Sequence, residues 1–307
     1  TSLGMTQEES QVATRKDFRP VVIAYVVCIA AAIATLYWIH SSYPPSDWRP
    51  LWAAFAADFV ATVVIFVYSR VYKNSSFYDP YWSVIPPILA IYWIWVYPES
   101  MENLRTWLVL ALVWAWGIRL TTNWSLYWPG LHHEDWRYPM VRERAGRFAV
   151  PADFLGIHLF PTIQVFLGCL PILVVVQHPE ASLGWLDAVA VIVMAGAILI
   201  QMVSDIQLHR FIANRKPGEL LDKGLWSWSR HPNYFGEIGV WVGLMLFGLA
   251  TAPEMWWLVC PGAVAMILMF VFASVPFLDN RSLERRPAYA EYMKRTSALI
   301  PLPPKRS

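Results

Sequence analysis

The chain has 307 residues, of which 57% are hydrophobic and only 15% are charged, and it contains 18 Trp. Soluble domains carry about 25% charged residues, so this composition indicates an integral membrane protein. A net charge of only +2 argues against a nucleic-acid-binding protein, and three Cys in apolar segments without a CxxC pair argue against a zinc site or a disulfide framework.

Eight apolar segments follow one another along the chain, and each predicts a membrane-spanning helix. A spanning helix needs about 20 apolar residues, and a helix satisfies its own backbone hydrogen bonds inside a bilayer. We therefore predict an all-α, polytopic membrane helix bundle of seven to eight transmembrane helices, forming a single domain (20–307) after a polar tail (1–19). The eight segments are 20–39, 51–68, 82–97, 104–121, 154–176, 183–204, 234–251 and 255–275.

The distribution of Lys and Arg predicts the orientation of this bundle. With a cytoplasmic N-terminus and alternating spans, 21 of the 24 Lys and Arg lie on the cytoplasmic side, Arg49 and Arg105 lie outside, and Arg119 stands at a helix end. This asymmetry favours eight spans with both termini in the cytoplasm. The first nineteen residues are polar and mixed in charge, which does not resemble a secretory signal.

Polar side chains gather in three predicted cytoplasmic segments, at 119–139, 204–237 and 279–301. Contact with lipid headgroups explains many basic residues of this kind. Interleaved acidic, amide and aromatic residues favour instead a polar pocket for a phosphorylated ligand, because Arg presents a planar fork to phosphate oxygens. Spacing leaves both interpretations open for the basic cluster, which comprises Arg119, Arg137, Arg215, Lys216, Lys223, Arg230, Arg281, Arg285 and Arg286.

Two patterns stand at predicted helix ends. Gln201, Asp205 and His209 are four residues apart and share one helix face, where Asp205 either binds a ribose or an Arg, or belongs to a self-satisfied polar stripe. In RHPNYFGE (230–237), Asn233 after a helix-breaking His-Pro step is typical of an N-terminal cap. Glu237 lies one turn later and needs a partner, because an uncompensated carboxylate is costly in a membrane.

A third polar pattern is SSFYDPYWSVIPP (75–87), which places Asp79 between Tyr78 and Tyr81 at the mouth of a predicted span. A buried carboxyl is protonated more readily, and a neutral carboxyl can donate a hydrogen bond to a substrate carbonyl. An ordinary Asp-Pro turn explains the same residues. The pair His132–His133, followed by two acidic residues, fits no usual zinc spacing, so we predict no metal site.

Three further motifs carry a family resemblance: RKPGE (215–219), GLWSWSRHPNYFGE (224–237) and AYAEYMKRTSALIP (288–301). In this order they resemble the steroid 5α-reductase family, and most closely its bacterial branch. The resemblance runs from about residue 75 to the end and is strongest after residue 201, and it implies a C-terminal steroid 5α-reductase-like region at about 150–307. It implies a polytopic oxidoreductase that binds NADPH at cytoplasmic helix ends and passes hydride to the β-carbon of a lipophilic enone, such as a 3-oxo-Δ4 steroid. It also implies the bacterial inner membrane, and we expect a monomer surrounded by membrane lipid.

The resemblance also implies roles for individual residues. Asp205 matches the family's cofactor Asp, Arg215 its phosphate-facing Arg, and Asn233 the Asn beside the nicotinamide. Further cofactor-binding residues are expected at Arg119, Arg137, Lys223, Arg230, His231, Tyr234, Glu237, Asn280, Arg281 and Arg285.

On the catalytic side this chain departs from the family's Gln-Glu pair and Tyr. Asp79 takes the position of the Glu, Tyr78 that of the Gln, and Trp116 that of the Tyr. We therefore expect Asp79, with Tyr78 or Tyr81, to polarise the substrate ketone.

Two other functions stay open. Membrane methyltransferases of the isoprenylcysteine type carry motifs similar to RHPNYFG. They transfer a methyl group from S-adenosylmethionine to a lipid or a prenylated thiol. RKPGE argues against that cofactor, because a phosphate-free molecule gains little from so many cations. The remaining alternative is a non-enzymatic sterol- or lipid-binding membrane protein.

Overall fold

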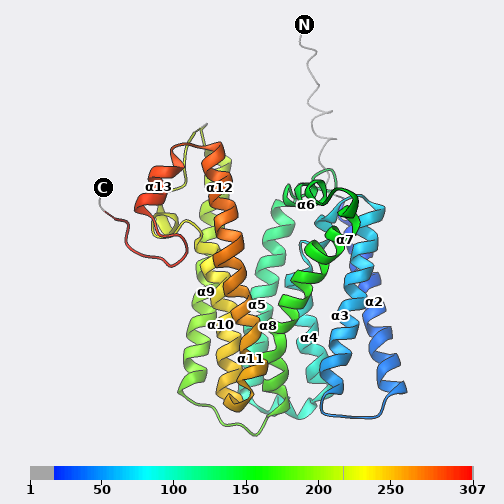
Figure 1. Ribbon diagram of the computed structural model, residues 1–307. Coiled ribbons are helices and arrows are strands. Elements are labelled where there is room, and N and C mark those ends of the chain that lie inside the picture. Colours follow the sequence, from blue (N-terminus) through cyan, green and yellow to red (C-terminus); the bar gives the residue numbers. More distant parts are fainter. Residues whose placement is uncertain (1–16, 217, 306–307) are drawn as a thin grey trace. The chain divides into compact units, whose positions relative to one another are not determined.

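The computed structural model describes residues 17–216 and 218–305 (Figure 1). The predicted tail falls mostly outside these residues, as does Pro217 of the RKPGE motif. The described residues are largely helical and contain no β-strand, apart from one isolated bridge between Ser229 and Ser297. The prediction of an all-α, polytopic bundle is confirmed.

Seven helical stretches of the described chain are long and apolar enough to cross a membrane, and they contain six of the eight predicted segments and nearly all of a seventh, 183–204. The remaining predicted segment, 82–97, corresponds to α4 (Tyr81–Val96), a helix of 16 residues with Pro86 and Pro87 inside it. At 1.5 Å per residue α4 is about 24 Å long, shorter than a hydrocarbon core of about 30 Å. Both termini lie on the same side of the membrane only if α4 crosses it too. The cytoplasmic location of both termini therefore stays a prediction. The seven stretches are Arg19–Ser42, Arg49–Val71, Leu104–Tyr127, Arg137–Gln177, Trp185–Asn214, Pro232–Thr251 and Pro253–Arg285.

The chain forms two compact units, which are described separately. Unit 1 comprises the described residues up to 85 together with 120–163, and unit 2 comprises 86–119 and the described residues from 164 onwards. Whether the two units make one domain, as the sequence analysis expects, stays a prediction.

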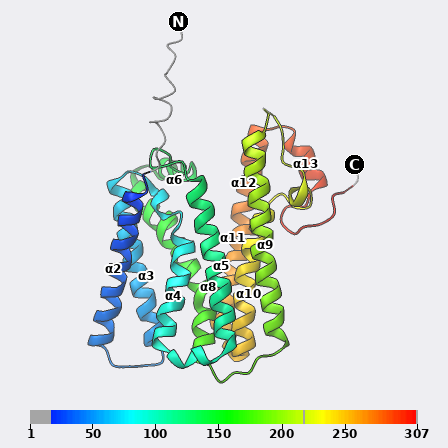
Figure 2. The same cartoon turned by 180° about the vertical axis from the view of Figure 1, so that it is seen from behind.

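Unit 1 is built on the helix pair α2 (Arg19–Ser42) and α3 (Arg49–Val71), which lie side by side (Figures 1 and 2). Both helices begin with Arg-Pro, and Pro is favoured at the first helical turn because its missing N–H has no partner there. Small buried residues on α3, such as Ala57, allow close packing. The rest of the unit contains η1 (Ser75–Tyr78), the first turn of α4, the end of α5 (Leu104–Tyr127), α6 (Arg137–Ala145), η3 (Gly146–Phe148), α7 (Ala149–Ala152), the π-helical η4 (Asp153–Leu159) and the start of α8 (Phe160–Gln177).

Unit 2 is built around α9 (Trp185–Asn214) and α10 (Pro232–Thr251). Three glycines let the two helices approach closely: a Cβ at Gly236 would lie 2.5 Å from the Gln201 side chain, and those at Gly239 and Gly243 would meet α9 at 2.7 and 2.6 Å. This packing brings Gln201 beside the first turns of α10. The unit also contains η2 (Pro98–Glu102), the first part of α5, most of α8, η5 (Gly224–Ser227), η6 (Pro253–Met255), α11 (Trp256–Met269), the π-helical η7 (Phe270–Ser274), α12 (Val275–Arg285) and α13 (Tyr289–Arg295).

A buried ion pair fixes the other end of unit 2, where α5 and α9 begin. The Arg105 guanidinium donates through Nε and Nη2 to the Asp187 carboxylate at 2.6 and 2.8 Å. It also donates to the carbonyl oxygens of Ala181 and Ser182. Arg105 is therefore fully used in holding the fold.

Candidate functional site

A cavity of about 430 Å³ lies at the end of unit 2 where α9 ends, α10 begins and α12 ends. Its wall is mostly apolar, with a few polar side chains among the apolar ones, which is typical of a site for a small molecule. The lining residues are Leu208, Phe211, Ile212, Arg215, Leu220, Leu221, Trp226, Arg230, His231, Asn233, Tyr234, Leu278, Ser282, Arg286, Tyr289 and Tyr292.

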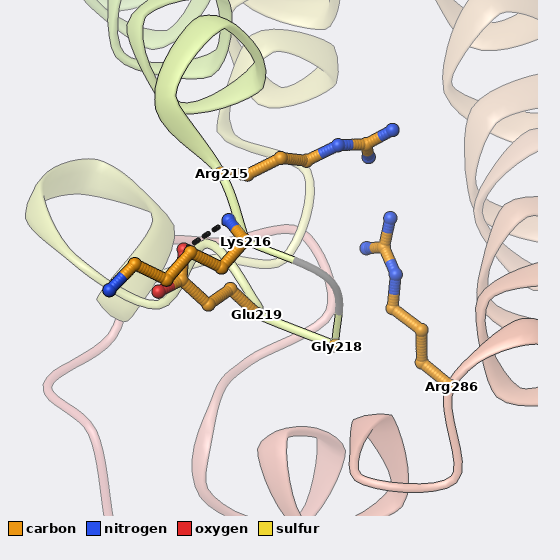
Figure 3. A pocket seen from close by; sticks show the side chains of 5 residues that line it. All are labelled: Arg215, Lys216, Gly218, Glu219 and Arg286. Carbon is orange, nitrogen blue, oxygen red and sulfur yellow. Dashed lines mark hydrogen bonds between the residues drawn. The ribbon is translucent and has the colours of Figure 1, made fainter.

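A second, basic pocket of about 310 Å³ shares Arg215 and Arg286 with this cavity, and is also lined by Lys216, Gly218 and Glu219. Figure 3 shows the guanidinium groups of Arg215 and Arg286 reaching from opposite sides toward the same space. Within the described residues, neither guanidinium makes a hydrogen bond or an ion pair. Two unpaired cations that share a hollow favour an anionic ligand, and phosphate oxygens match the guanidinium fork.

The loop that carries Arg215 has a tight local geometry. The Lys216 backbone N–H donates to the Glu219 carboxylate at 2.9 Å (Figure 3). Gly218 has φ +85°, in the left-handed region that glycine adopts without steric cost. This turn sets the direction in which the chain leaves α9 and thereby positions the Arg215 backbone.

Beside the pocket, a buried cluster centres on Asp279 of α12, which is only 4% exposed. Arg230 donates to Asp279 Oδ2 at 2.7 Å and to the Thr296 carbonyl oxygen at 2.6 Å. His231 Nε2 and the Tyr289 hydroxyl lie 2.9 and 2.7 Å from Asp279 Oδ1. Burial and the neighbouring carboxylate raise the pKa of Tyr289, so its hydroxyl stays a neutral donor. Arg230 and His231, predicted to bind the cofactor, line the cavity, but their polar ends bind the protein itself.

The same region ties down the C-terminal segment. The Arg230 backbone N–H donates to the Ser297 carbonyl at 2.9 Å, and the Ser229 hydroxyl donates to the Leu299 carbonyl at 2.7 Å. The Tyr292 hydroxyl donates to the Trp226 carbonyl. These bonds hold α13 and the residues after it against the loop before α10, so that Tyr289 and Tyr292 close one side of the cavity.

Glu237, for which the sequence analysis required a partner, has three. The Trp116 and Trp241 indole N–H groups donate to its carboxylate at 3.2 and 3.0 Å, and the Gln201 amide donates to it as well. Glu237 is 8% exposed, so these donors replace the water that its carboxylate lacks. Trp116, which the sequence resemblance aligns with a Tyr, thus uses its indole N–H to bind Glu237.

Arg119 and Asp205 continue this network. Arg119 Nη1 donates to Asp205 Oδ2 at 2.7 Å, and Nη2 donates to Gln201 Oε1 at 2.9 Å. Asp205 therefore orients an Arg, which is one of the two roles left open by its spacing. None of Arg119, Asp205 and Glu237 lines either cavity.

On α12 the cavity faces a different set of residues from the predicted one. The cavity is lined here by Leu278 and Ser282 of α12 and by Arg286, the extended residue that directly follows the helix. The predicted Asn280 and Arg285 are exposed, and Arg281 lines neither cavity. Sequence reasoning counted Arg286 in the basic cluster but missed it as a site residue. The predicted Lys223 is exposed and also lines neither cavity.

The predicted catalytic residues belong to unit 1. Asp79 is half-buried just before α4 and accepts a hydrogen bond from the Tyr138 hydroxyl at 2.5 Å. Burial raises the pKa of Asp79 to about 7, in the direction expected from the sequence. Arg137, predicted to bind the cofactor, also belongs to unit 1, where it pairs with Asp135 at 2.8 Å.

Tyr78 and Tyr81 stack with their ring centroids 4.9 Å apart. The Tyr78 hydroxyl lies 2.8 Å from Thr162 Oγ1, and the Tyr81 hydroxyl donates to Asp58 Oδ1 at 2.6 Å. Burial raises the pKa of Tyr78, which keeps its phenol protonated at neutral pH. Both tyrosines can therefore act as hydroxyl donors.

No cluster of three or more His, Cys, Asp or Glu side chains within residues 17–216 and 218–305 is arranged to hold a metal ion. The titratable groups described above are instead held by Arg, Trp, Tyr and Gln donors.

These features define an integral membrane protein of the all-α class with a basic pocket at one end of its larger unit. The chain belongs to the family described as protein of unknown function (DUF1295), whose profile matches residues 65–296. This family stands in the steroid 5α-reductase-like group. The chain is also similar to the uncharacterized protein C594.04c of Schizosaccharomyces pombe, with 24% identity over 256 residues, covering 75% of this chain and 73% of the relative. No solved structure matches the chain significantly.

Proposed function

We propose that this protein is an NADPH-dependent oxidoreductase that reduces the C=C bond of a lipophilic enone, such as a 3-oxo-Δ4 steroid. The observation that carries the proposal is the pair Arg215 and Arg286, whose unpaired guanidinium groups share one basic pocket. Membership of a family in the steroid 5α-reductase-like group supports the same reaction class.

The donor set fits a dinucleotide better than a phosphate-free cofactor. Arg215 and Arg286 match phosphate oxygens, and the adjoining cavity offers Asn233 and Tyr234 among apolar walls for a ring system. When bound, NADPH supplies the hydride that adds to the enone β-carbon. S-adenosylmethionine carries no phosphate and offers a single carboxylate, which can match only one of the two guanidinium groups.

Asp79 and the stacked tyrosines supply the substrate chemistry in this proposal. A carboxyl with a pKa of about 7 carries its proton in roughly half of the molecules at neutral pH, and in that form Asp79 donates a hydrogen bond to the ketone oxygen. That bond strengthens as negative charge develops on the oxygen during hydride addition. A donor placed in this way is commonly worth about 10²–10³ in rate.

The first experiment measures cofactor binding to the purified full chain by thermal shift, with NADPH and with S-adenosylmethionine. We expect stabilisation by NADPH that is lost in Arg215→Gln and in Arg286→Gln. The matched control is Arg210→Gln, which removes an exposed Arg of α9 that lines neither cavity. Stabilisation by S-adenosylmethionine alone would replace the proposal with a methyltransferase.

The second experiment measures NADPH oxidation with testosterone as the enone probe. Asp79→Ala should keep the NADPH-induced thermal shift and lose turnover by about 10²–10³-fold. Normal turnover in that variant would remove Asp79 from the mechanism.

A further inference from the structure

A carboxylic acid lies in the middle of α3, well inside a membrane-spanning stretch. Asp58 is 4% exposed, and within the described residues it makes no ion pair with a Lys, Arg or His. Its Oδ1 accepts from Tyr81, whereas its buried Oδ2 has no hydrogen-bond partner in the described chain. An isolated charge is very costly in such a place, so Asp58 carries a proton.

Asp58 is one end of a continuous chain of hydroxyl groups within unit 1. From the Tyr81 hydroxyl, which lies 2.6 Å from Asp58 Oδ1, the next oxygen is Thr62 Oγ1 at 3.1 Å. Thr62 Oγ1 lies 2.9 Å from Thr162 Oγ1, which lies 2.8 Å from the Tyr78 hydroxyl. All five side chains are at most 4% exposed, so bulk water does not interrupt the chain.

The Thr62 and Thr162 hydroxyls give this series of hydroxyl groups alternative hydrogen-bond arrangements. Thr62 Oγ1 and Thr162 Oγ1 each lie 2.9 Å from a carbonyl oxygen of their own helix, those of Asp58 and His158. Each hydroxyl has one proton, which it donates either to that carbonyl or to the next hydroxyl. Rotation of these two hydroxyls and of the Tyr81 hydroxyl, with the carboxyl proton of Asp58 turned toward Tyr81, therefore switches the hydrogen-bonded series between a resting arrangement and one in which every donor points toward Tyr78.

We propose that these five side chains form a proton relay, which stores a proton on Asp58 and delivers it through Tyr78 to the reduced substrate. The relay deepens the proposed function, on which it rests, because reduction of an enone needs one hydride and one proton. Tyr78 is the catalytic residue of the relay, and the other four side chains act through it.

The step balances as follows. Hydride from NADPH forms a C–H bond at the β-carbon and leaves an enolate and NADP⁺. The Tyr78 O–H bond breaks as its proton bonds to the enolate α-carbon, and each oxygen along the relay takes a proton from the next. Asp58 is left as a carboxylate, and after product release a water molecule in the emptied site returns a proton along the same route.

The relay is tested first without turnover, by hydrogen–deuterium exchange of the Asp58 carboxyl proton, followed by infrared spectroscopy on the full chain in lipid nanodiscs. The relevant carboxylic-acid band is the one that disappears in Asp58→Asn. We expect exchange in Thr62→Val to be slower by about tenfold or more, since a missing acid–base group costs on the order of 10²-fold. Thr62→Ser keeps the hydroxyl and should exchange like the wild type.

Thr162→Val and Thr162→Ser repeat the comparison on a second helix, in case one valine variant fails to fold. Equal exchange in the valine and serine variants would overturn the relay, whether or not the protein reduces enones. Absence of an Asp58 carboxylic-acid band in the wild type at neutral pH would overturn it too.

The second measurement uses NADPH and testosterone. Each valine variant should lose about 10²-fold in kcat with an unchanged KM for the steroid, and each serine variant should recover most of the rate. Failure of the wild type to oxidise NADPH with testosterone and with other enones would end the proposed function, and with it the catalytic use of the relay. The exchange result separates that outcome from a broken proton pathway.

Discussion

Two groups of arginines lie at the same end of unit 2, and the structure uses them in opposite ways. Arg230 is buried and binds Asp279 and two carbonyl oxygens of the C-terminal segment. Arg215 and Arg286 share a hollow and, within the described residues, bind no carboxylate. A cation whose donors are satisfied by the protein stabilises the fold, whereas one left unsatisfied beside a cavity is available to a ligand. The sequence alone does not distinguish the arginine that stabilises the fold from the two that are available to a ligand.

The largest expected effect, on the stability of the fold, comes from removing the carboxylate partner of the buried Arg230. Asp279→Asn leaves the buried Arg230 charge without its carboxylate, and loss of one partner of a buried ion pair costs about 3–5 kcal/mol. We expect a correspondingly large drop in the thermal unfolding temperature of the purified protein. The control is Asp222→Asn, which removes a partly exposed carboxylate paired with Arg295, and such pairs contribute about 0–1 kcal/mol. Equal losses in the two variants would show that the buried cluster has no special role in stability.

The second prediction gives Arg215 a carboxylate partner within the protein. Arg286→Glu places a carboxylate opposite Arg215, so the two side chains pair and the anion pocket disappears. We expect NADPH affinity to fall about 100-fold or more, with thermal stability equal to or above that of the wild type. Equilibrium titration and unfolding measured on the same preparation test both parts. An unchanged affinity would mean that the dinucleotide phosphates bind elsewhere.

The third prediction concerns pH and the carboxyl of unit 1. Because burial raises the pKa of Asp79 to about 7, the protonated donor is present below that pH and is lost above it. We expect kcat to fall about tenfold per pH unit above that pKa. The sign for stability is the same: the folded state holds this proton more tightly, so the contribution of Asp79 to stability declines as pH rises through about 7.

Asp79→Asn is the matched variant for this profile. It keeps a hydrogen-bond donor but cannot ionise, so the decline in kcat above neutrality should vanish while some activity remains. A profile that keeps its alkaline limb in the variant would assign that limb to another group.

The smallest expected effect concerns the loop that carries Arg215. Gly218→Ala forces a side chain into φ +85°, which costs about 1–2 kcal/mol, although no heavy atom lies within 4 Å of the added Cβ. We expect NADPH affinity to fall only a few-fold, as the loop relaxes and moves Arg215. Gly184→Ala, also without a close neighbour but with an ordinary φ of −137°, is the control. Equal affinity in both variants would show that the turn does not position Arg215.

The hydropathy of the sequence predicted the helices of this fold, because an apolar run of about 20 residues is typical of a membrane-spanning helix. The requirement that Glu237 have partners was also predicted, from the cost of a buried carboxylate. The partners themselves were not, since Trp116 and Gln201 come from two other helices of unit 2 and only packing joins them to α10.

The choice of Asn280 and Arg285 over Arg286 shows another limit. Adjacent residues at a helix end differ by about 100° in direction, and no pattern fixes that rotation when basic residues are clustered. Asp58 was missed because it stands alone in an apolar run without a motif. Its position inside a span was the available signal, since such residues are rare and costly.

The dependence of the cavity on Tyr289 and Tyr292 has a consequence for proteolysis. Both tyrosines follow the last of the spanning stretches in the described chain, so a cut after Arg286 would leave those stretches intact and remove one wall of the cavity. A chain shortened in this way would keep its apolar helices but lose its ligand chamber.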